Sequence, residues 1–147
     1  MVAPKSSLFW RLFNTSVRGH TAVFRLTGGR IGGRTMGAPV LLLHHTGAKS
    51  GKRRISPLLY LPDGDRAVIV ASKGGYTKHP AWFHNLMANP ETDIELPREG
   101  RIQVRARKAS PAEREELWPR VVDHYSGYAE YQRATEREIP VVILDRR

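Results

Sequence analysis

The sequence predicts an α+β domain of mainly antiparallel strands, closed into a small barrel. Short apolar strands are separated by hairpin signals, of which residues 62–65 (PDGD) and 98–100 (REG) are the clearest. Helix-start signals fall between groups of strands instead of after each strand, so the βαβ alternation of a parallel sheet is missing. A chain of 147 residues is long enough to form one domain with a sizeable core.

Residues 5–27 are expected to form an amphipathic helix ahead of the barrel. One face would carry apolar side chains at helical spacing, with His20 at its boundary: Phe9, Phe13, Val17 and Phe24. The opposite face would carry arginines at every seventh residue: Arg11, Arg18 and Arg25. Such a helix either packs on its own domain or lies on a membrane surface. Residues 28–39 (GGRIGGRTMGAP) predict a linker, which divides the chain into residues 1–39 and 40–147.

Six strands follow from apolar runs and from alternation of apolar and polar residues. They are expected at residues 40–46, 54–61, 66–72, 94–96, 102–108 and 141–144. In the fifth strand, Val104 and Ala106 alternate with Arg105 and Arg107, which predicts one buried face and one wet face. Pro140 precedes the last strand and favours an edge position, because proline has no N–H to donate to a neighbouring strand.

Three short helices are expected between the strands. The first, at residues 80–87, begins with a proline, which suits the first position of a helix. Residues 110–113 (SPAE) form a capping-box pattern that opens a helix at residues 110–125, which Pro119 would interrupt. Residues 128–137 predict the third helix.

The net charge of +10 is concentrated in the N-terminal part of the chain. Ten Lys and Arg residues and no acid precede Asp63, and 14 cations balance 14 acids from there onward. Such a field attracts a polyanion: nucleic acid, an anionic membrane or a highly charged cofactor. No apolar run could span a bilayer and no secretory signal is visible. A cytoplasmic location is therefore expected, with the inner face of the plasma membrane as the surface that the first helix could meet.

Protein-based nucleophilic and metal chemistry is not indicated by the residue pattern. The chain has no Cys, which excludes disulfides, thiolate metal sites and Cys nucleophiles. No Ser lies in a Gly-x-Ser-x-Gly elbow, and His79 and His84 are five residues apart, a poor metal spacing. No metal site is expected. A reaction without an evident protein acid, base or nucleophile often belongs to a cofactor.

Residues 45–54 (HTGAKSGKRR) look like a phosphate-binding loop but do not match the nucleotide-binding Walker A pattern. Three residues instead of four separate Gly47 from Gly51, and Arg53 stands where Ser or Thr would bind magnesium. The segment that follows contains Pro57 and reads as a strand, not a helix. The loop therefore joins two strands, either as an anion cradle or as a solvated basic turn.

Two further stretches could line a ligand site. Residues 71–75 (ASKGG) leave a strand through paired glycines, so backbone amides could approach a ligand closely; a plain turn is the alternative. Trp82 and Asn85 would share a helical face, although Trp82 also suits the core. Three tyrosines recur at every third residue and would share a broad helical face, either as core or as hydrogen-bond donors to a flat substrate: Tyr125, Tyr128 and Tyr131.

In combination these stretches resemble the deazaflavin-dependent nitroreductase family of actinobacteria, over roughly residues 8–145. The matching segments, in order, are HTGAKSGKRRISPL, ASKGG, HPAWFHNLMANP, YAEYQ and IPVVIL. The resemblance implies a split β-barrel related to FMN-binding flavoprotein reductases. It also implies reduced coenzyme F420 as cofactor, a deazaflavin with a phosphate and a poly-γ-glutamate tail. A polyanionic cofactor would account for the basic field.

The resemblance assigns roles to particular residues. The phosphate and acidic tail would meet the loop, with Arg54 as the firm charge partner, because arginine can bind phosphate oxygens bidentately. The loop residues are Ala48, Lys49 and Ser50. The deazaflavin ring would lie against strand backbone at Ile55, Ser56, Pro57, Leu58 and Leu59 and at Val70, Ala71, Ser72, Lys73 and Gly74. Trp82 and Asn85 would close the ring region, and Tyr128, Tyr125 and Tyr131 would face the substrate and supply a proton.

The expected reaction is hydride transfer to an electron-poor acceptor, a quinone first, with nitroaromatics as a second class. One departure concerns Leu59, where some members carry Tyr, while the aromatic residue here is Tyr60. Neighbouring strand residues point to opposite faces, so the substrate range is expected to differ. Three rival readings remain: a nucleic-acid-binding module, a membrane-peripheral module without catalysis, and an FMN-binding reductase. FMN has one phosphate and no acidic tail, so it needs fewer cations.

Overall fold

The structure is a computed structural model that describes residues 34–35, 38–72 and 78–147. The predicted helix at residues 5–27 lies outside the described residues, as do Lys73 and Gly74. The predicted linker is described only at its end, where Arg34–Thr35 form a short strand instead of a loop.

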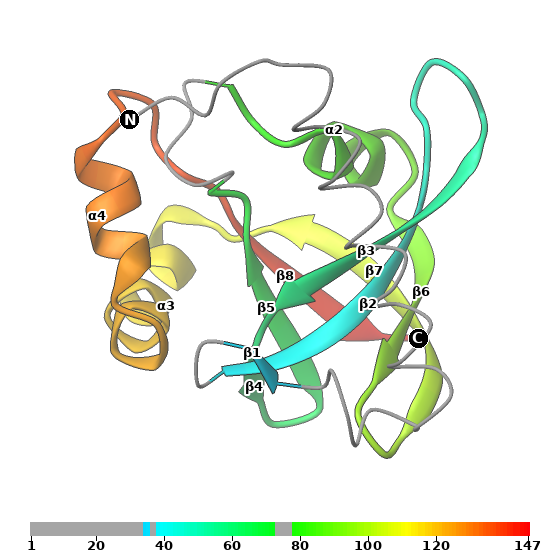
Figure 1. Cartoon of the computed structure of the whole chain (residues 1–147), viewed down its shortest axis with the longest axis horizontal. Helices are drawn as coiled ribbons and strands as arrows, with labels where there is room; N and C mark the ends of the chain where they lie inside the picture. The colour runs from blue at the N-terminus through cyan, green and yellow to red at the C-terminus, as the bar shows by residue number, and fades with distance from the viewer. Residues whose placement is uncertain (1–33, 36–37, 73–77) are drawn as a thin grey trace.

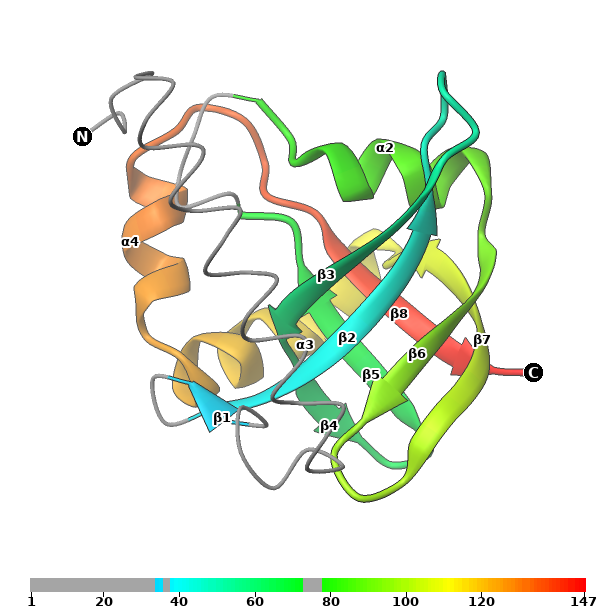
Figure 2. The same ribbon diagram turned by 45° about the vertical axis from the view of Figure 1, so that its right-hand side comes forward.

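One curled antiparallel sheet forms the body of the protein (Figures 1 and 2). Its strands are β1 (Arg34–Thr35), β2 (Ala38–Thr46), β3 (Arg53–Leu59), β4 (Leu61–Asp63), β5 (Arg66–Val70), β6 (Glu91–Leu96), β7 (Gly100–Lys108) and β8 (Val141–Arg146). They are ordered β1-β2-β6-β7-β8-β5-β4, with β3 paired to β2, and every pairing is antiparallel. The predicted α+β fold with a split barrel of antiparallel strands is confirmed.

In the described part of the chain three helices flank the sheet: α2 (Ala81–Ala88), α3 (Pro111–His124) and α4 (Gly127–Arg133). Figure 1 shows α2 across one end of the curled sheet, with α3 and α4 together at its side. The predicted capping box opens α3, and the helix runs through Pro119 without ending there. Within residues 34–35, 38–72 and 78–147, no helix combines the length and apolarity needed to cross a membrane.

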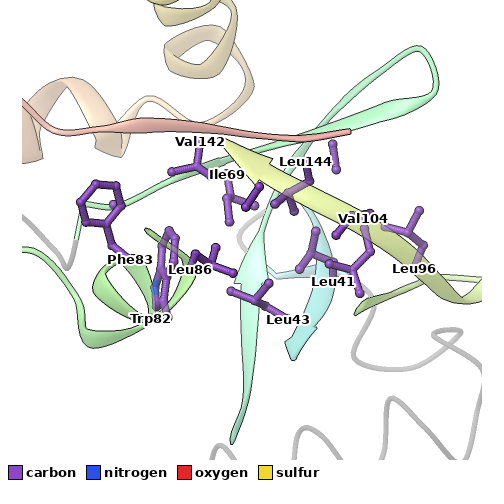
Figure 3. Close-up of a cluster of buried hydrophobic side chains, with 14 residues drawn as sticks. Leu41, Leu43, Ile69, Trp82, Phe83, Leu86, Leu96, Val104, Val142 and Leu144 are labelled. Atoms are coloured by element: carbon purple, nitrogen blue, oxygen red, sulfur yellow. The ribbon is translucent and has the colours of Figure 1, made fainter. Parts of the chain in front are cut away.

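Alternation along the strands creates two hydrophobic clusters. Ala67 and Ile69 face the inside of the curled sheet, where they join leucines of β2 and the buried face of α2 (Figure 3). Val68 and Val70 face the other side, where α3 and α4 cover them. β5 is therefore apolar on both faces, which is why its sequence reads as a continuous hydrophobic run.

The expected edge position of the last strand is wrong. β8 lies between β7 and β5 and pairs with both. Pro140 is tolerated because it precedes the ladder and needs no N–H there. Its carbonyl accepts a hydrogen bond from the N–H of Ala71 at 3.0 Å, which joins the start of β8 to the end of β5.

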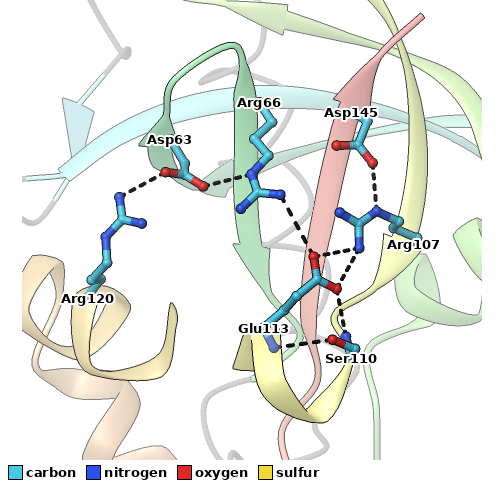
Figure 4. A network of polar contacts seen from close by, with 7 residues as sticks. All are labelled: Asp63, Arg66, Arg107, Ser110, Glu113, Arg120 and Asp145. Atoms are coloured by element: carbon cyan, nitrogen blue, oxygen red, sulfur yellow. Dashed lines mark hydrogen bonds and ion pairs between the residues drawn. The ribbon is translucent and has the colours of Figure 1, made fainter. Parts of the chain in front are cut away.

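Charged side chains fasten α3 to the sheet (Figure 4). The Arg107 guanidinium of β7 donates to both Glu113 oxygens, at 2.7 and 2.9 Å, and to Asp145 of β8 at 2.7 Å. Glu113 also accepts the N–H of Ser110 and so closes the capping box. The Arg107 guanidinium lowers the pKa of Glu113 to about 2, and the Ser110 N–H acts in the same direction.

Removing the Glu113 charge is expected to make stability less sensitive to acid. A carboxyl whose pKa is lowered by folding stabilises the protein above its unfolded pKa, near 4.5, and loses that contribution as the pH falls toward 2. Glu113→Gln keeps a capping side chain but not the charge. We expect the wild type to melt at a higher temperature than the variant at pH 7 and the gap to close by about pH 2. A gap independent of pH in thermal unfolding would contradict this account.

Candidate functional site

The basic loop forms the tip of the β2–β3 hairpin and projects past α2 (Figures 1 and 2). Hydrogen bonds of 2.9 Å, from Gly51 N–H to Gly47 O and from Gly47 N–H to Lys52 O, close the turn. Gly51 has a φ of 68°, in the left-handed region that favours glycine. A Cβ on Gly47 would collide with the Ser50 hydroxyl. The loop is therefore a compact strand-to-strand turn whose tip is exposed.

The cations of this hairpin are not neutralised by the protein itself. Lys49, Lys52, Arg53 and Arg54 are exposed, and no carboxylate in the described part of the chain pairs with them. By contrast, arginines elsewhere on the sheet and on α3 have carboxylate partners within 3.0 Å: Arg66, Arg101, Arg107, Arg120 and Arg146. A cluster of unpaired cations fits a ligand with several negative charges.

β3 and the end of β5 form an open seam in the sheet. β3 pairs with β2 along Arg53–Leu59, while the ladder between β4 and β5 ends at Val68. β3 also contacts β5, with no ladder between the two in the described residues. The residues predicted to line a flat ring therefore lie on β3 (55–59) and at the end of β5 or directly after it (70–72).

The β3 side chains alternate as the sequence implied. Leu58 and Tyr60 pack against the interior cluster, so Leu59 lies on the other side of the strand. Arg54 stands directly opposite His45 in the β2–β3 ladder, and paired residues of an antiparallel ladder share a face. Arg54 and Ser56 thus belong to the same face as His45.

α2 is joined to the β2–β3 loop by hydrogen bonds of Asn85. Asn85 is buried, and its Oδ1 accepts the N–H of Ala48 at 2.9 Å. Its Nδ2 contacts His45 Nδ1 at 2.9 Å, and His45 Nε2 contacts Ser56 Oγ at 2.9 Å. Trp82 is also buried, within the interior cluster, as the core alternative required. The sequence reasoning missed His45, although a polar residue that continues a buried strand face is a detectable signal.

Burial, the charge of Arg54 and the neighbouring His44 lower the pKa of His45 to about 4, in that order of importance. His45 is therefore neutral at physiological pH. His44 faces the other way, where its Nε2 contacts Glu95 at 2.7 Å. The two adjacent histidines consequently belong to different polar networks.

Arg137 is a second residue that the sequence did not reveal. Its guanidinium donates to the carbonyls of Ala71 and Ser72, at 3.2 and 2.8 Å, and to His79 Nδ1 at 2.8 Å. Desolvation lowers the pKa of Arg137. These bonds fix the backbone where the chain leaves β5, immediately before Lys73.

The three tyrosines form one cluster, but they do not share one helix. Tyr125 follows the end of α3, while Tyr128 and Tyr131 lie on α4. The hydroxyls of Tyr125 and Tyr131 are hydrogen-bonded at 3.1 Å, and the ring of Tyr128 meets that of Tyr125 edge to face. Tyr128 packs with Val70 in the outer cluster, so these phenols lie on the side of β5 away from the barrel interior.

Both α4 phenols are held in their protonated form. Burial raises the pKa of Tyr128, and the hydrogen bond with Tyr125, followed by burial, raises that of Tyr131 to about 12. The Tyr128 hydroxyl has no hydrogen-bond partner among the described residues. Such phenols can donate a hydrogen bond or a proton but do not act as bases near neutral pH.

No three His, Asp or Glu side chains in the described ranges gather into a group that could hold a metal ion. The arrangement consists instead of an unpaired cationic hairpin, an open strand seam and a cluster of protonated phenols. Exposed cations can bind an anionic ligand, and protonated phenols can donate a hydrogen bond.

A family model and a sequence relative indicate the same family for this chain. The family model described as F420H2-dependent quinone reductase matches residues 16–146. An F420H2-dependent quinone reductase of Mycobacterium tuberculosis is 46% identical over 135 residues, which cover 89% of this chain and 90% of that protein.

Two solved structures are also similar. An F420-H2 dependent reductase (FDR-A) has a TM-score of 0.67 and 42% identity over 73% of this chain and 94% of its own. A structure described as a domain-swapped dimer has a TM-score of 0.70 and 36% identity over 95% of this chain and 100% of its own.

Proposed function

This chain belongs to the F420H2-dependent quinone reductase family, and from that membership we propose that it reduces a quinone at the expense of reduced coenzyme F420. The observation that carries the proposal is the cluster of cations on the β2–β3 hairpin that have no carboxylate partner in the described chain. The phosphate and poly-γ-glutamate tail of this coenzyme are the charges that such a cluster suits.

Within the proposal, Lys49, Ser50 and Arg54 hold the phosphate, and Lys52 and Arg53 serve the acidic tail. All five are exposed on one hairpin. Ala48 has a different part, because its N–H is already donated to Asn85 and holds the loop. The donor set therefore fits the coenzyme through side chains more than through the Ala48 amide.

The ring is proposed to lie in the seam between β3 and the end of β5, against residues 55–59 and 70–72. Lys73 and Gly74, which follow in the sequence, belong to the same proposed set. Arg137 donates to the carbonyls of Ala71 and Ser72, so contacts within the protein orient the backbone there. Trp82 lies in the interior cluster and would support the ring site from the core.

Bound in this seam, reduced coenzyme F420 supplies the hydride. The chain orients the acceptor, excludes water and provides a proton donor. We assign the donor role to Tyr128, with Tyr125 and Tyr131 beside it, because the Tyr128 hydroxyl has no hydrogen-bond partner among the described residues and can therefore donate to a ligand. A nitroaromatic acceptor remains the second candidate class for the same site.

A side-by-side titration tests the cofactor. We expect purified protein to bind coenzyme F420 more tightly than FMN, because FMN lacks the acidic tail that the extra cations would meet. Added salt should weaken binding of the coenzyme more than binding of FMN, since more ion pairs are screened. Equal affinities, or tighter FMN binding, in a fluorescence titration would contradict the proposal.

We also propose that residues 5–27 bring the enzyme to membrane surfaces that contain its quinone. The support is the sequence pattern, in which an apolar stripe is backed by three arginines. A triple variant in which Arg11, Arg18 and Arg25 are each replaced by Glu should lose co-sedimentation with anionic liposomes. Sedimentation equal to that of the wild type would remove this role.

A further inference from the structure

The hydrogen bonds between α2 and the hairpin determine where the His45 proton lies. A backbone N–H can only donate, so the Ala48 N–H fixes Asn85 Oδ1 as the acceptor at 2.9 Å. The other end of the same amide, Nδ2, then faces His45 Nδ1 at 2.9 Å. An amide nitrogen also only donates, so Nδ1 must accept, and a neutral ring carries its proton on Nε2.

The second nitrogen of His45, Nε2, reaches β3, against which the coenzyme ring is proposed to lie. The Nε2–H donates to Ser56 Oγ at 2.9 Å, which leaves the hydroxyl hydrogen of Ser56 free to donate elsewhere. A single neutral imidazole thus orients two groups at once. One is the Ala48 amide at the hairpin tip, and the other is the Ser56 hydroxyl on β3.

We propose that His45 is a positioning residue for the coenzyme site, which acts through Asn85 on the Ala48 turn and directly on the Ser56 hydroxyl. The inference rests on the proposed function for its ligand, and on the described hydrogen bonds for its geometry. It also revises the expected role of Asn85, which supports the loop instead of touching the coenzyme ring. The two nitrogens of the histidine ring supply an acceptor, Nδ1, and a donor, Nε2–H. Aliphatic side chains have neither.

The surroundings keep His45 neutral, as this role requires. β3 brings the charge of Arg54, and β2 brings His44, whose ring contacts Glu95 of β6 on the opposite face. α2 contributes the uncharged Asn85 amide, while its one ionisable residue, His84, is exposed. Protonation of Nδ1 would set two donors against each other and would break the link to Ala48.

The first test needs no ligand. Long-range nitrogen–proton NMR of the full chain should show His45 neutral, with the proton on Nε2, between about pH 5 and 7, because its pKa lies near 4. In Asn85→Asp, a carboxylate oxygen would face Nδ1, so His45 should become protonated at higher pH than in the wild type. A wild-type proton on Nδ1, or an unchanged His45 titration in Asn85→Asp, would overturn the network.

The second test links the network to the coenzyme. His45→Leu should weaken coenzyme F420 binding about tenfold in a fluorescence titration, the equivalent of roughly one hydrogen bond. His44→Leu is the matched control, because His44 is an equally buried neighbour whose ring points away from Asn85 and Ser56. The affinity of this variant for the coenzyme should stay at the wild-type value. His45→Asn, which restores an acceptor near Asn85, should recover part of the loss.

The two proposals fail differently. Equal affinities for the wild type and His45→Leu, or equal losses in the two leucine variants, would overturn the positioning role while leaving the coenzyme proposal intact. Absence of coenzyme binding by the wild type would overturn the proposed function and the coenzyme role of His45 together, whatever the NMR result.

Discussion

Arg54→Ala is expected to weaken coenzyme F420 binding by about 1–3 kcal/mol, the range for hydrogen bonds to charged groups. Arg54 is exposed, has no carboxylate partner among the described residues, and shares a face with Ser56. Its planar guanidinium can grip two phosphate oxygens at once. Fluorescence titration of the variant and the wild type under the same salt conditions measures the difference.

Arg101→Ala provides the control for loss of positive charge. Arg101 is exposed on β7 and pairs with Asp93 at 2.7 Å, in a β6–β7 ladder that does not include the hairpin. Its removal lowers the net charge by the same amount but should leave the affinity near the wild-type value. Equal losses in both variants would reduce Arg54 to a contributor to the general field, and an unchanged affinity for Arg54→Ala would remove it from the site.

Tyr128→Phe is expected to slow quinone reduction by about 100-fold, the lower end of the range for general acid catalysis, while coenzyme affinity stays unchanged. The substitution keeps the ring that packs against Val70 and Tyr125. The hydroxyl has no partner in the described structure, so its loss should not alter the melting temperature. Turnover at saturating coenzyme, together with thermal unfolding, tests both statements.

Tyr131→Phe separates proton donation from hydrogen bonding within the cluster. This variant breaks the 3.1 Å contact with Tyr125 and leaves Tyr128 intact. A smaller loss of turnover than in Tyr128→Phe would support Tyr128 as the donor. If Tyr128→Phe turned over at the wild-type rate, the proton would come from another group.

Local sequence signals predicted the elements well. The turn at Gly64, with φ of 60°, and the turn that contains Arg98 and Gly100, with φ of 65° and 80°, stand where the hairpin signals placed them. The capping box opens α3 with both reciprocal hydrogen bonds. These features depend on neighbouring residues alone, so the sequence contains what is needed to predict them.

Features set by tertiary contacts were harder to predict. Pro140 suggested an edge, but the strand after it is central, because only the residues that follow the proline join the ladder. The spacing of the tyrosines suggested one shared helical face, but the cluster spans the break between α3 and α4, with Tyr125 after the end of α3. Residue spacing does not reveal how side chains from two helices meet across such a break.

The candidate site shows the same division. The cationic loop was evident from composition, and the structure adds that its charges have no carboxylate partner among the described residues. The partners of Asn85 lie 37 and 40 residues away in the sequence, at Ala48 and His45, so no local pattern indicates them. Arg137 reaches the end of β5 over a separation of more than 60 residues. Supporting interactions of this kind require the fold.

Oxidation of reduced coenzyme F420 by a soluble naphthoquinone, followed spectroscopically with purified protein, tests whether the protein is a quinone reductase. We expect a rate proportional to protein concentration, which falls steeply in Tyr128→Phe and which Arg54→Ala lowers at subsaturating coenzyme. A rate equal to the protein-free background with several quinones, in a protein that does oxidise reduced FMN, would contradict this expectation.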